Sequence, residues 1–434
     1  EVCQETTATL WDFGQGEDSR LAAEVPQASP QISKPVEDAY DEVIDRVFRR
    51  IEQKESLIAR EGAQARELFD ELMRHPAARQ HLMVANSVRF LTRTMCEHLL
   101  ARSHEAGFQD PAHAIDIARL GVAVADRLGA REAAPEAAEA AAVNLRARAW
   151  AQLGNALRIS SDLEGSERAF ATAESLLRDD GRGGMLDRAR VFDLLASLRR
   201  DQGRYAEAFR LLDRVEATYR RLGHWHLLGR TLAQKSMVCD ELGDLETEML
   251  LLRRALDLLD PQEEPRMFLA ARHNLILALN QTGRHREAFA LLFHTRPLYL
   301  QAGDRMNLVR LRWLEGSVAM GLGRIGQAEV AFREVRESFV ALGLAYDAAQ
   351  ASLDLANVYI LQGRTGETRR LAQEMLAIFQ SLHVHREALA AWLVFREAAE
   401  MEQAGVGLVR DVAEFLKRAR NNHELQFARS SRSR

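Results

Sequence analysis

Apolar residues recur at steps of three and four along most of the chain, the spacing that gathers side chains on one face of an α-helix. One such stripe consists of Val43, Ile44, Val47, Phe48 and Ile51. Runs of β-branched residues that alternate with polar residues, which would indicate strands, are absent. The pattern therefore predicts a chain built entirely of α-helices.

The N-terminal part of the chain predicts a leader followed by a few helices. Residues 1–35 contain three prolines among serine, glutamine and alanine, which is typical of a flexible segment. One helix is predicted from residue 36 to about residue 51, a second over 57–73, closed by His75-Pro76, and two more through 79–104. We interpret residues 36–104 as a helical cap for the region that follows.

A repeat then begins. Five turn-like sequences start with a glycine at intervals of 40 residues, at Gly203, Gly243, Gly283, Gly323 and Gly363. A weaker copy, Ser161-Asp162-Leu163, lies 42 residues before the first glycine, and the interval carried forward predicts a turn at Gln403-Ala404-Gly405. This register predicts a repeat array, which we place at residues 105–425, with a disordered basic tail over 426–434.

Each repeat predicts one helix before the glycine and one after it, because glycine adopts the left-handed conformation that ends a helix. The interval leaves about 17 residues for each helix, or about 26 Å. Mostly small residues stand seven positions before the glycine and five after it, where they would let paired helices approach closely. The former are Ala196, Ser236, Ile276, Gly316 and Ala356, and the latter are Ala208, Glu248, Ala288, Ala328 and Thr368.

This pattern resembles the tetratricopeptide repeat, a helix–turn–helix unit of about 34 residues with small residues at these two positions. The resemblance covers roughly residues 105–420. The longer unit is similar to the repeats of bacterial signalling proteins, including Rap-type regulators and related peptide-pheromone receptors. The resemblance implies a right-handed superhelical solenoid of antiparallel helix hairpins that binds a protein or a peptide.

In such a solenoid the first helix of each hairpin lines a concave groove. Positions 13, 9, 6 and 2 before each turn would share one stripe on that helix. The residues predicted to bind a partner there are Arg148, Gln152, Asn155, Arg190, Arg230, Gln234, Asn274, Arg310, Asp354 and Asn357. Arginine suits a carboxylate or phosphate, and the amides suit a peptide backbone. The alternative is that these arginines pair with acids of neighbouring helices. The lysine and asparagine pattern of the family's carboxylate clamp is not reproduced.

Other polar residues carry less specific signals. Arg204, Arg284 and Arg364 precede a glutamate by three positions, which predicts local ion pairs. Two pairs of histidines are separated by one residue, in His224-Trp225-His226 and His383-Val384-His385. Side chains two positions apart point away from each other on a helix, so these pairs do not indicate a metal site. No phosphate loop, nucleophile elbow or HExxH motif occurs, and the sequence predicts neither an enzyme nor a bound cofactor.

Composition narrows the class of protein. The 434 residues include 58 Lys and Arg and 63 Asp and Glu, which gives a net charge of −5. A chain without an excess of basic residues is not expected to bind nucleic acid directly. Neither a secretory signal nor a membrane-spanning run is evident. Three scattered cysteines predict a reducing compartment, hence the cytoplasm, and the excess of arginine over lysine is typical of bacteria with GC-rich genomes.

The resulting hypothesis is a non-enzymatic scaffold that holds a protein or peptide segment in its groove. The segment is expected to be acidic or to carry a free carboxylate. One alternative is a regulator switched by a signalling peptide, like the pheromone receptors that the repeats resemble. Another is the partner subunit of a larger effector whose catalysis lies on a different chain.

Overall fold

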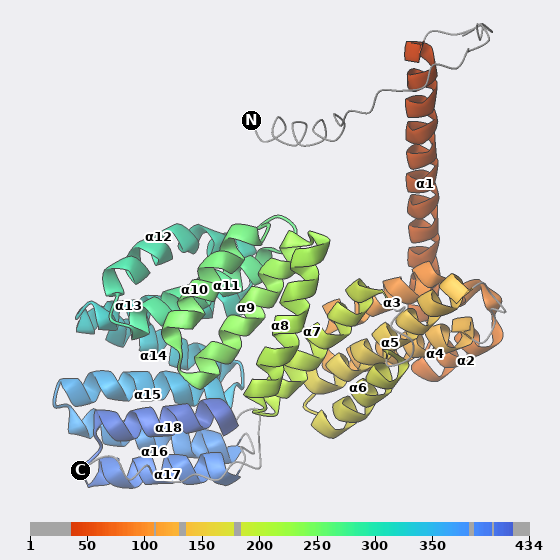
Figure 1. The fold of residues 1–434 in the computed structure, drawn as a ribbon. Coiled ribbons are helices and arrows are strands. Elements are labelled where there is room, and N and C mark those ends of the chain that lie inside the picture. The colour runs from red at the N-terminus through yellow and green to blue at the C-terminus, as the bar shows by residue number, and fades with distance from the viewer. Residues whose placement is uncertain are drawn as a thin grey trace, which may run out of the picture. The chain divides into compact units, whose positions relative to one another are not determined.

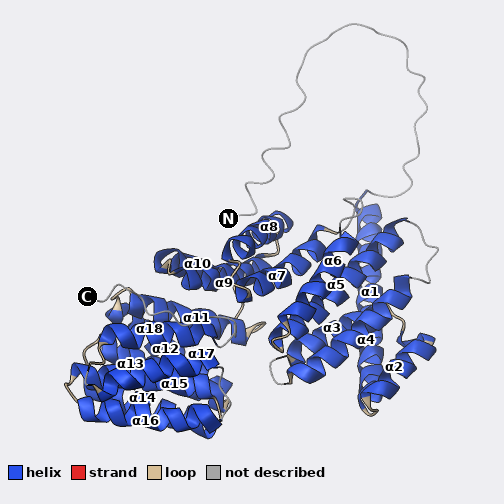
Figure 2. Cartoon of the chain, turned by 90° about the horizontal axis from the view of Figure 1, so that it is seen from below, coloured by secondary structure: helices blue, strands red, loops and turns tan. Residues whose placement is uncertain are grey.

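The computed structural model describes residues 36–107, 110–129, 136–177, 184–381, 386–401 and 403–419. Within these ranges every regular element is a helix and no strand occurs (Figure 2). The prediction of an all-α chain is therefore confirmed. The chain divides into two compact units, residues 1–61 and residues 62–434. The predicted leader and basic tail lie outside the described residues.

The N-terminal helices differ from the prediction in one respect. Helix α1 (Val36–Met73) is continuous, so the prediction of two helices there is wrong. Residues 52–56 contain neither glycine nor proline and are mostly good helix formers, so nothing ends the helix between the two apolar stripes. The two helices expected through 79–104 are α2 (Ala77–Asn86) and α3 (Arg93–Ala106), with a short 3₁₀ helix (Val88–Phe90) between them, and α4 (Pro111–Gly129) follows.

The repeats form consecutive helix hairpins (Figure 1). The first helices of the hairpins are α5 (Glu136–Ile159), α7 (Met185–Asp201), α9 (Trp225–Leu242), α11 (Pro265–Gln281), α13 (Arg305–Gly321), α15 (Ala345–Leu361) and α17 (Arg386–Glu400). The second helices are α6 (Leu163–Leu177), α8 (Tyr205–Leu222), α10 (Leu245–Leu258), α12 (His285–Ala302), α14 (Ile325–Ala341), α16 (Thr365–Ser381) and α18 (Val406–Ala419). Each hairpin packs on its neighbours, and the buried apolar residues form clusters that continue from one hairpin into the next. This is the expected solenoid.

The predicted turns are confirmed. All five register glycines have positive φ, between 70° and 79°, and Ser161 of the weaker copy has a φ of 69°. A Cβ atom at these glycines would meet nothing within 4 Å, so the backbone conformation and not the available space favours glycine there. Gly223, Gly303 and Gly343 also have positive φ. They follow second helices, halfway between consecutive positions of the 40-residue register. The sequence analysis did not predict these three.

In two hairpins, close packing of the helices involves a glycine seven positions before the turn and a phenylalanine nine positions after it. At Gly316 an added Cβ would lie 2.9 Å from the Phe332 ring, and at Gly154 it would lie 2.8 Å from the Phe170 ring. A phenylalanine therefore packs directly on a bare backbone in these two hairpins. The α11–α12 hairpin instead has Ile276 and a leucine there, and α12 packs less closely on α11 and α13 than α14 does on α13 and α15.

Candidate functional site

The arginines of the predicted stripe lie on first helices, and two of them pair with acids of neighbouring helices. Arg148 on α5 contacts Glu97 of α3 at 3.3 Å and Asp187 of α7 at 3.5 Å. Arg230 on α9 lies 3.0 Å from Glu264, the N-cap residue of α11. These two guanidinium groups therefore join consecutive hairpins, as the alternative interpretation expected.

The other two arginines are more accessible. Arg190 contacts Asp187 of its own helix at 3.4 Å but keeps 42% of its side chain exposed. Arg310 is exposed, and no carboxylate of the described residues pairs with it. It lies near His273, whose ring nitrogen is 2.6 Å from the Tyr299 hydroxyl. Burial and the charge of Arg310 together lower the pKa of His273 to about 4, so this histidine is neutral at pH 7.

Two hydrogen bonds between consecutive first helices occur at the same pair of repeat positions. Asp193 and Trp313 stand ten positions before their turn glycines, and each bonds to the residue nine before the next turn. Gln234 donates to Asp193 at 2.9 Å, and Trp313 Nε1 donates to Asp354 at 2.6 Å. Burial raises the pKa of both carboxyl groups to about 6, against the opposing effect of these donors. The predicted residues Gln234 and Asp354 thus link consecutive first helices.

The remaining amides of the stripe lie deeper. Gln152 is buried and donates to the Ser103 hydroxyl of α3 at 3.2 Å. Asn155 is also buried and accepts from Arg158 at 3.0 Å. Asn357 has a buried Oδ1 that no described donor reaches. The structure therefore places Gln152 and Gln234 in contacts between helices, and the role of the amides in binding a partner remains a prediction.

The last predicted residue, Asn274, lines a polar cavity of about 270 Å³ where α18 meets the ends of α7 and α9. Helix α18 packs on α15 and α17, and Lys417 near its end lies 2.7 Å from Asp240 of α9. Tyr205 and Arg418 complete the polar lining. Periodicity in the sequence could not show that α18 reaches a hairpin 177 residues away.

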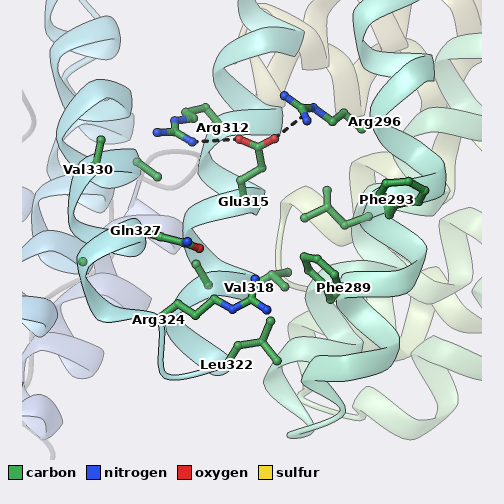
Figure 3. Close-up of a pocket in the computed structure, with 14 residues that line it drawn as sticks. Phe289, Phe293, Arg296, Arg312, Glu315, Val318, Leu322, Arg324, Gln327 and Val330 are labelled. Carbon is green, nitrogen blue, oxygen red and sulfur yellow. Dashed lines mark hydrogen bonds and ion pairs between the residues drawn. The ribbon is translucent and has the colours of Figure 1, made fainter.

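A second hollow was not predicted at all. A cleft of about 470 Å³ lies between α12 and α14, with α13 as its floor (Figure 3). Its apolar lining includes Phe289, Phe293 and Val330, whose residues are 43%, 69% and 46% exposed. On its rim, Glu315 contacts Arg312 at 3.1 Å and Arg296 at 3.5 Å. Figure 3 shows this group of charges at one end of the cleft and Arg324 at the other.

The turn arginine of this cleft differs from its counterparts. Arg204, Arg284 and Arg364 each pair with the glutamate three positions later, at 2.6, 2.6 and 3.0 Å, which confirms the predicted local pairs. In the turn that follows Gly323, the residue three positions after Arg324 is Gln327 instead of a glutamate. No carboxylate of the described residues pairs with this arginine. Its guanidinium lies over the Phe289 ring instead, 5.1 Å from the centroid. A break in the Arg–Glu repeat was the sequence signal that could have identified this cleft.

Residues considered for metal or covalent chemistry have other contacts. His226 lies 3.3 Å from Glu264, and His383 and His385 fall outside the described residues. Over the described part of the chain, no three potential ligands come together. The Cys96 thiol is buried and donates to the Gly121 carbonyl at 3.5 Å, and burial raises its pKa to about 12. Nor is any described helix long and apolar enough to cross a membrane.

Comparisons with known proteins agree with this architecture. A model of the tetratricopeptide repeat family matches residues 187–260, which span α7 to α10. A search of curated proteins finds no match. The family match places tetratricopeptide repeats over these two hairpins, in the register that the sequence predicted.

Several solved structures share the fold. A Rap protein complexed with competence and sporulation factor aligns with a TM-score of 0.53 at 13% identity, over 75% of this chain and 87% of that one. The apo quorum sensor NprR from B. thuringiensis aligns at 0.52 and 12% identity, over 70% and 81%. Aspartyl phosphate phosphatase F from Bacillus subtilis aligns at 0.51 and 12% identity, over 85% and 95%. Identities this low establish a shared fold only.

Proposed function

We propose that this chain is a non-enzymatic scaffold that binds a protein or peptide segment along the first helices of its hairpins. The observation that carries the proposal is the accessibility of Arg190 and Arg310 on a stripe where Arg148, Arg230, Gln234 and Asp354 are held by contacts between hairpins. Cross-helix bonds at Gln234 and Asp354 hold the helices in register. The exposed guanidinium groups are therefore presented on a preorganised surface, which lowers the entropic cost of binding.

The chemistry of the stripe favours an acidic segment or a free carboxylate, because arginine binds carboxylates with two parallel hydrogen bonds. One structure of similar fold is a Rap protein complexed with competence and sporulation factor, which supports a binding role for this chain. We further propose a bacterial, cytoplasmic protein. Switching by a signalling peptide, or assembly with a catalytic subunit on another chain, would both use this surface.

Affinity capture tests the proposal. The purified chain serves as bait in host lysate beside a variant with Arg190, Arg230 and Arg310 changed to Glu. A matched control carries the same change at the turn arginines Arg204, Arg284 and Arg364, which also lose ion pairs with acids. We expect a stoichiometric partner that the control captures and the stripe variant loses, with helicity unchanged by circular dichroism. A partner retained by the stripe variant would contradict the groove assignment.

A small-angle scattering experiment separates the switch from the passive scaffold. A peptide that binds the stripe and changes the superhelical pitch would alter the scattering profile. Binding with an unchanged profile favours the scaffold, and an unchanged profile with every bound peptide would exclude the switch.

A further inference from the structure

The cleft between α12 and α14 carries a separate inference, because its location and chemistry differ from those of the stripe. On α13 the cleft is lined by Arg312, Glu315 and Val318, whereas the stripe residue is Arg310. Helical spacing places these two sets on different faces of the helix. The cleft is therefore available whether or not a partner occupies the first-helix stripe.

The walls of the cleft on α12 and α14 carry accessible apolar side chains. Phe293 is 69% exposed, more than any other large apolar residue among those described, and Phe289 and Val330 are also exposed. Exposed aromatic and branched side chains around one hollow are typical of a site that buries an apolar side chain of a partner. The volume of about 470 Å³ lies within the usual range of ligand sites.

The charges around the cleft determine which partner fits. Three arginines and one glutamate line it, and Glu315 is already engaged with Arg312 and Arg296. At the opposite end, Arg324 lacks the acid that its three counterparts have and rests on Phe289. A guanidinium held on an aromatic ring keeps its edge free for hydrogen bonds. The cleft is thus complementary to an apolar side chain with a carboxylate beside it.

We propose that this cleft is a docking site for an acidic peptide segment of a partner protein. An aromatic or branched side chain of the segment fills the hollow between Phe289, Phe293 and Val330. A neighbouring aspartate or glutamate pairs with Arg324. Gln327 stands where the other Arg-bearing turns have a glutamate, which leaves Arg324 available for this contact.

The test is fluorescence anisotropy with the full chain and a short labelled peptide that has a central Asp-Leu-Trp-Glu sequence and an amidated C-terminus. We expect saturable binding that weakens with added salt. Replacing the tryptophan of the peptide by alanine, or its acids by their amides, should reduce affinity about tenfold each. Absence of saturable binding, or binding that ignores both changes, would overturn the proposal.

Variants of the chain locate the binding. Arg324→Gln should weaken it about tenfold, and Gln327→Glu should weaken it similarly because the new carboxylate competes for Arg324. Phe293→Ala should also cost about tenfold. Arg204→Gln and Leu242→Ala remove an acid-paired arginine and a 60% exposed leucine elsewhere, and should leave the affinity unchanged.

Two further comparisons make the outcome decisive. The variant with Arg190, Arg230 and Arg310 changed to Glu should still bind the peptide, and adding Arg324→Gln to it should weaken that binding about tenfold, so failure of the proposed groove function would be seen separately. If that variant loses the peptide while Arg324→Gln retains it, the peptide binds the stripe and the cleft proposal is wrong. Equal losses in the control variants would also overturn it. Helicity measured by circular dichroism confirms that each variant is folded.

Discussion

Hairpins α11–α12 and α13–α14 are adjacent copies of one repeat, yet one pair is tightly packed and the other leaves a cleft beside it. In α13–α14, Gly316 lets the Phe332 ring lie directly on the backbone. In α11–α12 the same positions hold Ile276 and Leu292, and α12 is less closely packed. Proline at position 297 within α12 removes one backbone hydrogen bond as well. The repeat register fixes where helices lie, while the residues at this pair of positions differ between the copies and place a ring directly on the backbone where glycine occurs.

The two hairpins also differ in the hydrogen bonds that their first helices form. Ten positions before the turn, α11 has His273, which bonds to Tyr299 of the same hairpin. At that position α13 has Trp313, which bonds to Asp354 of the next hairpin. One contact stabilises the hairpin and the other joins it to its neighbour. Identical positions in a repeat can therefore serve different interfaces.

The largest effect is expected from filling the space at Gly316. Gly316→Leu would force a side chain into the Phe332 ring, which an added Cβ alone already approaches to 2.9 Å. We expect the free energy of unfolding to fall by about 3 kcal/mol, the upper part of the usual cost of overpacking. Chemical denaturation followed by circular dichroism measures this change. Gly326→Ala is the control, because a Cβ there meets nothing within 4 Å.

A second substitution tests whether the loss comes from that contact. Phe332→Ala in the Gly316→Leu background should recover part of the stability, so that the two changes are not additive. If Gly316→Leu alone is as stable as the wild type, close packing of this hairpin does not depend on glycine, and the comparison of the two hairpins loses its physical basis.

The comparison also shows what the sequence could and could not predict. Glycines at a fixed interval report a local conformation, so the hairpins and their turns were predictable. The side-chain volumes at Ile276 and Gly316 could be read from the sequence. Their effect on helix packing also involves the residue nine positions after the turn, a position that the pattern of small residues did not include. The residues of the stripe lie on first helices of the hairpins. The contacts of Arg148, Arg230 and Gln234 were not predictable, because each partner belongs to another hairpin.

A smaller effect is expected at the bond between Trp313 and Asp354. Burial raises the pKa of Asp354 from 3.8 to about 6, so the folded chain retains this proton at pH values where the unfolded chain has released it. Lowering the pH from 7 to 5 should therefore stabilise the wild type by about 1 kcal/mol through this group. Asp354→Asn keeps an acceptor for Trp313 but cannot titrate, and should lack that gain.

Denaturation at the two pH values, in the wild type and the variant, provides the measurement. The quantity to compare is the change in the free energy of unfolding between pH 7 and pH 5, since other groups titrate equally in both chains. An equal change in the two proteins would mean that Asp354 is not desolvated in solution. A larger acid stabilisation in the variant would reverse the sign and contradict the burial of this carboxyl group.

The smallest expected effect concerns the missing acid at Gln327. Gln327→Glu recreates the Arg–Glu pair of the other turns, and should change the free energy of unfolding by no more than a few tenths of a kcal/mol, because exposed pairs contribute little. Thermal unfolding checks this, with Arg204→Gln as the converse change. A large stabilisation would mean that the glutamine had been a structural weakness. A negligible one, beside a tenfold loss of peptide affinity, would mean that the difference between these repeats concerns binding and not folding.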